Sequence, residues 1–216
     1  MRVCRIEISG LREIKEGTLN LAQHTVLVGS NNAGKSTILE GLMLALQPWR
    51  RTASLSEYLF FGGRPTPEAR IQVKVTLTGF PTNDPSEYPE WFNTNTGCAL
   101  PLYWNETNST LSPDEKNGTL AVTLGWVARY DPDTGEIETK RYFVDGEGDP
   151  FLHEGTEVPA RLLRELKVLH VPPERTLSPF AGRSGPLYRY LRELDAVPVS
   201  SDKGPKESPA GAQAYT

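Results

Sequence analysis

The sequence has few of the residues that build covalent cross-links or metal centres. Its 216 residues include only two cysteines, Cys4 and Cys98, and three histidines. Two distant cysteines do not form a disulfide framework, and they lack the close spacing of zinc ligands. A reducing cytoplasm is therefore the simplest location for the protein.

Long apolar runs and an excess of one charge are also missing. No segment approaches the ~20 apolar residues that span a bilayer, and the opening "MRVCRIEISG" has no apolar stretch resembling a signal-peptide core. We therefore expect no membrane association. The formal net charge is −4, with 38% hydrophobic and 23% charged residues. This balance is ordinary for a soluble domain and gives no compositional argument for nucleic-acid binding.

A glycine-rich loop is the most informative feature that the sequence does contain. Residues 29–36, "GSNNAGKS", fit the P-loop pattern G-x-x-x-x-G-K-[ST]. The β-branched run 24–29 before it predicts a buried strand. The segment 35–47 after it predicts a helix, with one apolar face made of Ile38, Leu39, Leu42, Met43 and Leu46. A strand directly before the loop and a helix directly after it disfavour a chance match.

The residue types of this loop suit a polyphosphate. Gly29 and Gly34 allow the backbone N–H groups to approach the phosphates, and the helix that follows presents its positive end. Lys35 reaches the β- and γ-phosphates, the Ser36 hydroxyl is a Mg²⁺ ligand, and Thr37 lies near the α-phosphate. The predicted cofactors are ATP and Mg²⁺. The predicted nucleotide-binding loop comprises Gly29, Ser30, Asn31, Asn32, Ala33, Gly34, Lys35, Ser36 and Thr37.

Strands dominate the rest of the chain. Alternating apolar residues predict strands over 2–9, 17–23, 70–80, 119–131 and 137–146, the last two joined by a hairpin around "PDTG". Further predictions are a helix over 159–167, a strand over 168–171 and a helix over 185–194. We expect one lobe over residues 1–196, interrupted by a long loop insertion at 81–118 with a few aromatic anchors. Residues 197–216 predict a flexible tail or the start of a linker.

The first part of the chain resembles a known group of ATPases. "IEISGLREIKEGTLNLAQHTVLVGSNNAGKSTILEGLMLAL" is similar to the amino-terminal lobe of ABC-type ATPases of the SMC/RecF-like group. That group opens with a strand, an Asn-Phe-Arg-Ser-Phe-like turn, a second strand and then G-x-N-x-x-G-K-S/T. "GLREI" stands at the turn, so the resemblance places Arg12 on the family's arginine and implies a contact with the nucleotide phosphates. Asn32 is consistent with the loop of this group.

A later segment narrows the resemblance. "VLHVPPERTL" followed by "GPLYRYLREL" resembles an element of the overcoming-lysogenization-defect (OLD) family ATPases, which include subunits of anti-phage systems. The implied fold class is α/β, a P-loop ABC-type half-head with a mixed β-sheet and an antiparallel β-subdomain around the P-loop helix. The implied function is an ATP-binding lobe that gates a DNA-processing, DNA-repair or anti-phage nuclease machine. The implied assembly is a homodimer of the complete protein.

Several catalytic elements of that group are missing from the sequence. No apolar strand ends in the acidic pair of a Walker B element, no "LSGG" signature occurs, and no glutamine follows the 168–171 strand. His24, His153 and His170 are in the wrong context for a switch histidine. In the family these elements come from a carboxy-terminal lobe. We therefore predict no catalytic residue in this chain and slow turnover without a partner. The expected partner is a C-terminal ATPase lobe or a Toprim-type nuclease domain, in the same gene product or a separate chain.

Other functions stay open on the residues alone. A non-catalytic nucleotide-binding regulatory or interaction module would need the same loop. A P-loop kinase is a more distant alternative, because the β-rich stretch after the first helix includes no lid-like arginine helix. A DNA partner rests on family analogy, since basic pairs such as Lys140-Arg141 are explained more simply as balancing 27 acidic residues.

Overall fold

The fold is described by a computed structural model for residues 1–48, 55–63, 65–92, 98–115, 118–144, 148–152 and 157–171. The chain divides into two compact units, Met1–Val168 and Leu169–Thr216. All helices and strands given below belong to the first unit. The predicted helix over 185–194 and the predicted tail over 197–216 lie outside the described residues.

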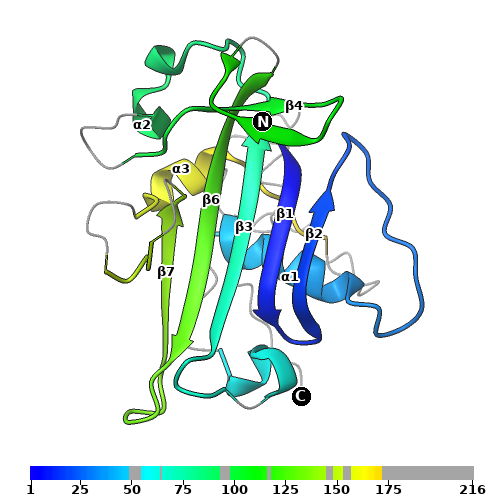
Figure 1. Cartoon of the computed structure of the whole chain (residues 1–216), viewed down its shortest axis with the longest axis vertical. Helices are drawn as coiled ribbons and strands as arrows, with labels where there is room; N and C mark the ends of the chain where they lie inside the picture. Colours follow the sequence, from blue (N-terminus) through cyan, green and yellow to red (C-terminus); the bar gives the residue numbers. More distant parts are fainter. Residues whose placement is uncertain are drawn as a thin grey trace, which may run out of the picture. The chain divides into compact units, whose positions relative to one another are not determined.

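One antiparallel sheet of seven strands forms the frame of the first unit (Figure 1). Its strand order is β2-β1-β3-β6-β4-β5, and β7 also pairs with β6. The bounds are β1 (Arg2–Leu11), β2 (Ile14–Asn20), β3 (Arg70–Thr78), β4 (Leu102–Asn105), β5 (Thr110–Ser112), β6 (Thr119–Tyr130) and β7 (Ile137–Phe143).

Most predicted strands are confirmed with small shifts at their ends. The largest shift concerns β2, which begins at Ile14 rather than at residue 17. The hairpin around "PDTG" is also confirmed, since the Asp131 and Glu136 backbones pair through a 2.9 Å hydrogen bond from N to O. Alternating apolar residues identified these strands because one sheet face packs on the core.

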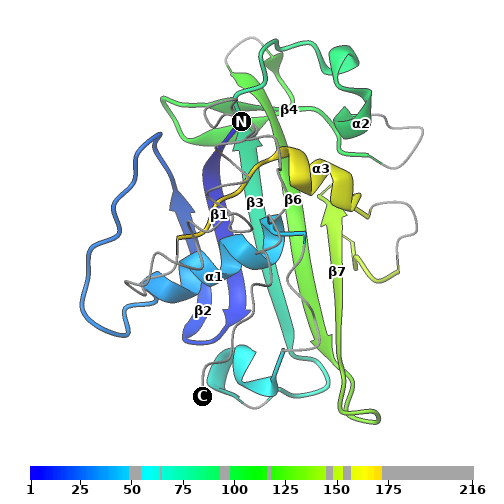
Figure 2. The ribbon, with the colours of Figure 1, turned by 180° about the vertical axis from the view of Figure 1, so that it is seen from behind.

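The prediction of a mixed sheet is wrong for the described residues, because all their strand pairings are antiparallel. Two predicted strands, 24–29 and 168–171, have no regular structure. Val26 and Val28 are 83% and 89% exposed. The chain leaves the sheet after β2 and loops out to the side before α1 begins (Figures 1 and 2). A strand needs a neighbour for its backbone groups, and no described strand pairs with 24–29.

Helix α1 (Lys35–Leu46) confirms the helix predicted after the loop and crosses one face of the sheet (Figure 2). The predicted apolar face is only partly correct, because Leu39 is 48% exposed. Compared with the predicted face, the buried face includes the small residues Gly41 and Ala45. A Cβ added at Gly41 would lie 3.2 Å from Cδ1 of Ile8. The missing side chain therefore lets β1 approach the helix closely. The buried residues of α1 are Thr37, Gly41, Met43, Leu44, Ala45 and Leu46.

The carboxyl end of α1 is held by Arg141 of β7. Its Nε donates to the Leu44 carbonyl at 2.9 Å, and its Nη2 donates to the Gln47 carbonyl at 2.8 Å. The last carbonyls of a helix have no partner within the helix, and a cation there also suits the helix dipole. Burial lowers the pKa of the Arg141 guanidinium below its usual value. Arg141 thus fixes α1 to the sheet at the end opposite to the P-loop.

The segment predicted as a long loop insertion carries regular structure. It contains a 3₁₀ turn (Pro85–Glu87), helix α2 (Pro89–Phe92), β4 and β5. Its large aromatic residues are buried, namely Trp91, Phe92, Tyr103 and Trp104. Two further 3₁₀ turns (Glu57–Leu59 and Phe61–Gly63) precede β3, and helix α3 (Ala160–Glu165) confirms the helix predicted over 159–167. Within the described ranges, no helix has both the length and the apolar character needed to cross a membrane.

We expect Arg141→Met to reduce the free energy of unfolding by about 1.5–3 kcal/mol, because two charge-assisted hydrogen bonds to helix carbonyls are lost. Urea denaturation followed by circular dichroism measures the change. The control is Arg161→Met, which removes an exposed arginine whose ion pair with Glu90 spans 3.2 Å. Exposed pairs contribute about 0–1 kcal/mol, so equal losses in the two variants would contradict a special role for Arg141.

Candidate functional site: the P-loop and the start of helix α1

The predicted loop turns sharply into α1. Gly34 adopts a left-handed conformation with φ of 80°, and Asn32 does the same with φ of 68°. The Ala33 N–H donates to the Ser30 carbonyl at 3.3 Å, and the Ile38 N–H donates to the Gly34 carbonyl at 2.9 Å as the helix begins. No side chain caps the amino end of α1. The backbone N–H groups of its first turn can therefore face an anion.

Gly34 is required by this geometry for two reasons. Its positive φ is unfavourable for residues that carry a Cβ. A Cβ at this position would also lie 3.3 Å from Cδ1 of Ile14 on β2. The second glycine of the motif thus allows both the turn into the helix and the contact of the helix with the first hairpin.

Lys35 closes the loop on itself. Its Nζ donates to the Gly29 carbonyl at 2.8 Å and to the Ser30 carbonyl at 2.6 Å. These bonds join the two ends of the motif, so the loop is wound around the ammonium group. An ammonium has three N–H donors, and a phosphate oxygen can accept from the third. The contact of Lys35 with the β- and γ-phosphates stays a prediction.

The two hydroxyl residues after Lys35 differ in their surroundings. Ser36 is exposed, which suits the predicted role as a Mg²⁺ ligand. Thr37 is only 2% exposed, and its Oγ1 donates to Oε1 of Glu13 at 2.6 Å. The Thr37 hydroxyl is thus bonded to a carboxylate. Its predicted contact with the α-phosphate stays a prediction, as does the Ser36–Mg²⁺ contact.

Arg12 lies in the turn between β1 and β2, where it has an unusual positive φ of 50°. Its guanidinium forms an ion pair with Glu40 of α1, in which Nη2 lies 3.3 Å from Oε1 of Glu40. The hydrogen bond to Glu40 raises the pKa of Arg12. The structure therefore brings Arg12 to the P-loop helix, but to the side of the helix and not to the loop.

The sequence prediction missed Glu13 and Glu40 near the start of α1, and Arg141, which holds the far end of the helix. Glu13 and Arg141 contact α1 from other elements, and Glu40 is a residue of α1 that contacts Arg12. These partners are far apart in the sequence, and Arg141 and Leu44 are separated by 97 positions. Glu13 stands beside Arg12 in "GLREI", and that position is the one local signal that could have identified it. The other two contacts follow no spacing that a sequence displays.

The donor set fits a nucleotide better than a lone metal ion. Within the part of the chain that the structure describes, no group of three or more His, Cys, Asp or Glu could hold a metal ion. Mg²⁺ keeps several waters and binds mainly through the phosphates of a nucleotide. The Ser36 hydroxyl together with triphosphate oxygens is a suitable ligand set. The uncapped helix end and the Lys35 ammonium are suitable partners for the phosphates themselves.

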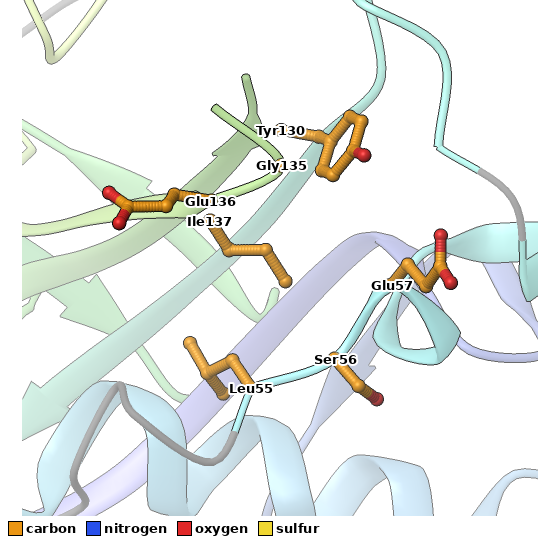
Figure 3. Close-up of a pocket in the computed structure, with 7 residues that line it drawn as sticks. All are labelled: Leu55, Ser56, Glu57, Tyr130, Gly135, Glu136 and Ile137. Atoms are coloured by element: carbon orange, nitrogen blue, oxygen red, sulfur yellow. The ribbon is translucent and has the colours of Figure 1, made fainter. Parts of the chain in front are cut away.

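A separate hollow of about 640 Å³ lies between the end of the β6–β7 hairpin and the segment before β3 (Figure 3). Leu55 and Ile137 point into it, and the carboxylates of Glu57 and Glu136 lie on opposite sides. Its described lining also includes Ser56, Tyr130 and Gly135 and has no basic side chain. This hollow does not suit a phosphate group, so the P-loop is the candidate site.

The loop, its lysine and the uncapped helix define a module of the P-loop type. Residues 1–76 match a family model described as an AAA ATPase domain. The matched part contains β1, β2, the P-loop, α1 and most of β3. The match supports a P-loop ATPase family of the SMC/RecF type and an ATP-binding P-loop module over this part. No curated protein matches the chain.

We expect Gly34→Ala to destabilise the protein by more than the ~1 kcal/mol that a left-handed alanine costs, because the new methyl group also meets Ile14. The matched control is Gly135→Ala in the β6–β7 turn, where φ is 71° and no atom lies within 4 Å of an added Cβ. Thermal denaturation compares the two. A smaller loss at Gly34 than at Gly135 would show that the loop does not hold this conformation.

Proposed function

We propose that this chain is the ATP-binding lobe of an OLD-like ATPase of the SMC/RecF group. The observation that carries the proposal is the loop wound around Lys35, with its ammonium bonded to the carbonyls of Gly29 and Ser30. This loop leads directly into a helix end with no side-chain cap. Positive charge and free N–H donors at one point are what a triphosphate requires. Mg²⁺ joins the nucleotide through Ser36.

A second lobe supplies the groups for hydrolysis in this proposal. Phosphoryl transfer to water needs a residue that orients the water and a carboxylate near the metal. Among the described residues, Glu13 is a carboxylate that contacts the first turn of α1, and it is bonded to Thr37 and not placed to hold a metal. The partner is a C-terminal ATPase lobe or a Toprim-type nuclease domain, and the complete protein is a cytoplasmic homodimer that gates a DNA-processing or anti-phage nuclease machine.

The segment before the P-loop supports such a partner. Val26 and Val28 are almost fully exposed, and Leu39 of α1 is 48% exposed. Burial of a valine or leucine side chain contributes roughly 1.5–3 kcal/mol. A strand from the partner that pairs with 24–29 would bury these side chains and satisfy the backbone groups of the segment. The strand predicted from the sequence would then form in the complex.

Arg12 completes the proposed nucleotide contacts by an exchange of partners. In the structure its guanidinium is paired with Glu40. A triphosphate carries more negative charge than one carboxylate, and guanidinium groups bind phosphate through paired hydrogen bonds. The arginine therefore leaves Glu40 when it contacts the phosphates.

A regulatory module that binds nucleotide without hydrolysis is the second candidate. The observation that favours it is the engagement of Thr37 by Glu13, which removes one hydroxyl from the phosphate side of the helix. Both candidates share the same nucleotide site and differ in turnover.

We expect Lys35→Ala to weaken ATP binding at least tenfold, because a charge-assisted hydrogen bond to phosphate is lost and the loop is no longer held by its own lysine. Isothermal titration calorimetry with Mg-ATP measures the affinity. Lys74→Ala is the control, since Lys74 lies on β3 beside Glu7, on the sheet face opposite to α1. Unchanged affinity in the Lys35 variant would contradict the proposed site.

We also expect the isolated chain to release phosphate from ATP at a rate close to that of the Lys35→Ala variant. The reason is that this chain contributes the loop and the metal ligand but no water-orienting acid. A colorimetric phosphate assay under saturating Mg-ATP compares the two proteins. Substantial turnover that Lys35→Ala abolishes would show that a catalytic acid resides in this chain, contrary to the proposal.

A further inference from the structure

The turn between β1 and β2, with the first residue of β2, lies along the start of α1 at three regularly spaced positions. Residues three apart lie on one side of a helix, so the turn follows one side of α1 from the loop toward its middle. Ile14 lies where a Cβ of Gly34 would meet it, Glu13 bonds Thr37, and Arg12 pairs with Glu40.

The backbone of this turn is fixed on the core. Leu11 is fully buried and forms a β-bridge with Phe60. The Arg12 N–H donates to the Leu59 carbonyl at 2.7 Å. Gly10 and Arg12 both have positive φ, 72° and 50°. A turn held in this way presents the Glu13 carboxylate to α1 at a defined place.

Glu13 supplies a negative charge that the first turn of α1 does not have. The first turn of α1 includes no acidic residue, and its N-cap residue, Gly34, makes no side-chain hydrogen bond. A carboxylate near a helix amino end is stabilising because it offsets the positive end of the dipole. Through the Thr37 hydroxyl, Glu13 takes the position of this missing charge. The neighbouring cation Arg12 directs its own hydrogen bonds to Glu40.

We propose that Glu13 is an affinity-determining residue that competes with the nucleotide phosphates for the start of α1. This inference rests on the proposed function. Two groups of like charge at one helix end disfavour each other. The Thr37 hydroxyl has a single donor proton, which cannot serve Glu13 and a phosphate at once. Nucleotide binding therefore releases Thr37 from Glu13 and loosens the β1–β2 turn from the helix.

The competition is tested with Glu13→Gln, which keeps an acceptor oxygen for Thr37 and removes the charge. We expect Mg-ATP to bind about two- to fivefold more tightly at low ionic strength, with a smaller gain at high salt because the effect is electrostatic. Isothermal titration calorimetry measures both affinities. Glu16→Gln is the matched control, since Glu16 is an exposed carboxylate on β2 with the same change of charge, and we expect no gain there.

Two further variants, Glu13→Ala and Lys35→Ala, decide between the possible outcomes. Glu13→Ala removes the charge and the acceptor together, so we expect a gain in affinity at least as large as that of Glu13→Gln. Circular dichroism checks that each variant folds as the wild type does. An unchanged or weaker affinity in the Glu13 variants, or an equal gain in Glu16→Gln, would overturn the competition. Lys35→Ala separates the proposed nucleotide site from the proposed competition by Glu13. Retained ATP binding in the Lys35 variant would overturn the nucleotide site itself.

Discussion

The attachment of helix α1 to the antiparallel sheet is the constraint on which the site depends. At the carboxyl end, Arg141 reaches from β7 to the carbonyls of Leu44 and of the C-cap residue Gln47. At the amino end, Glu13 reaches from the first hairpin to Thr37. Between them, the small side of the helix, including Gly41, lies against β1. A phosphate cradle made of backbone N–H groups works only if the helix is held in place, and the Arg141 hydrogen bonds and the close packing of Gly41 on β1 provide that support, while the Glu13–Thr37 contact is the one that the nucleotide replaces.

The electrostatics of the site follow from the same arrangement. The amino end of a helix carries partial positive charge, and the Lys35 ammonium adds a full one at the loop. The fold offsets this charge internally, with loop carbonyls on Lys35 and a carboxylate near the helix start. A site built in this way has internal counter-charges that a nucleotide replaces. Its affinity for nucleotide is then a difference between two sets of partners, and it depends on residues such as Glu13 that lie outside the motif.

The sequence predicted those parts of the fold that depend on local periodicity. The alternation in β3 and β6 and the helical spacing after Lys35 are visible in the residues, and the loop is defined by Gly34 and Lys35. The predicted strand over 24–29 does not form, because strand formation depends on a neighbouring strand and not on apolar residues alone. Likewise, helical spacing predicts that Leu39 is a core residue. The helix packs on β1 through the side that contains Gly41, and Leu39 is left half exposed. The contacts of Glu13 and Arg141 join residues 24 and 97 positions apart, which no local pattern reveals.

The most direct test of the nucleotide site is amide hydrogen exchange of the wild-type chain with and without Mg-ATP. If the backbone between Gly29 and Thr37 wraps the phosphates, exchange slows in the peptides that cover the loop and the first turn of α1. The outer strands β4 and β5 then keep their exchange rates. Protection that arises elsewhere while the loop exchanges as fast as before would contradict the account.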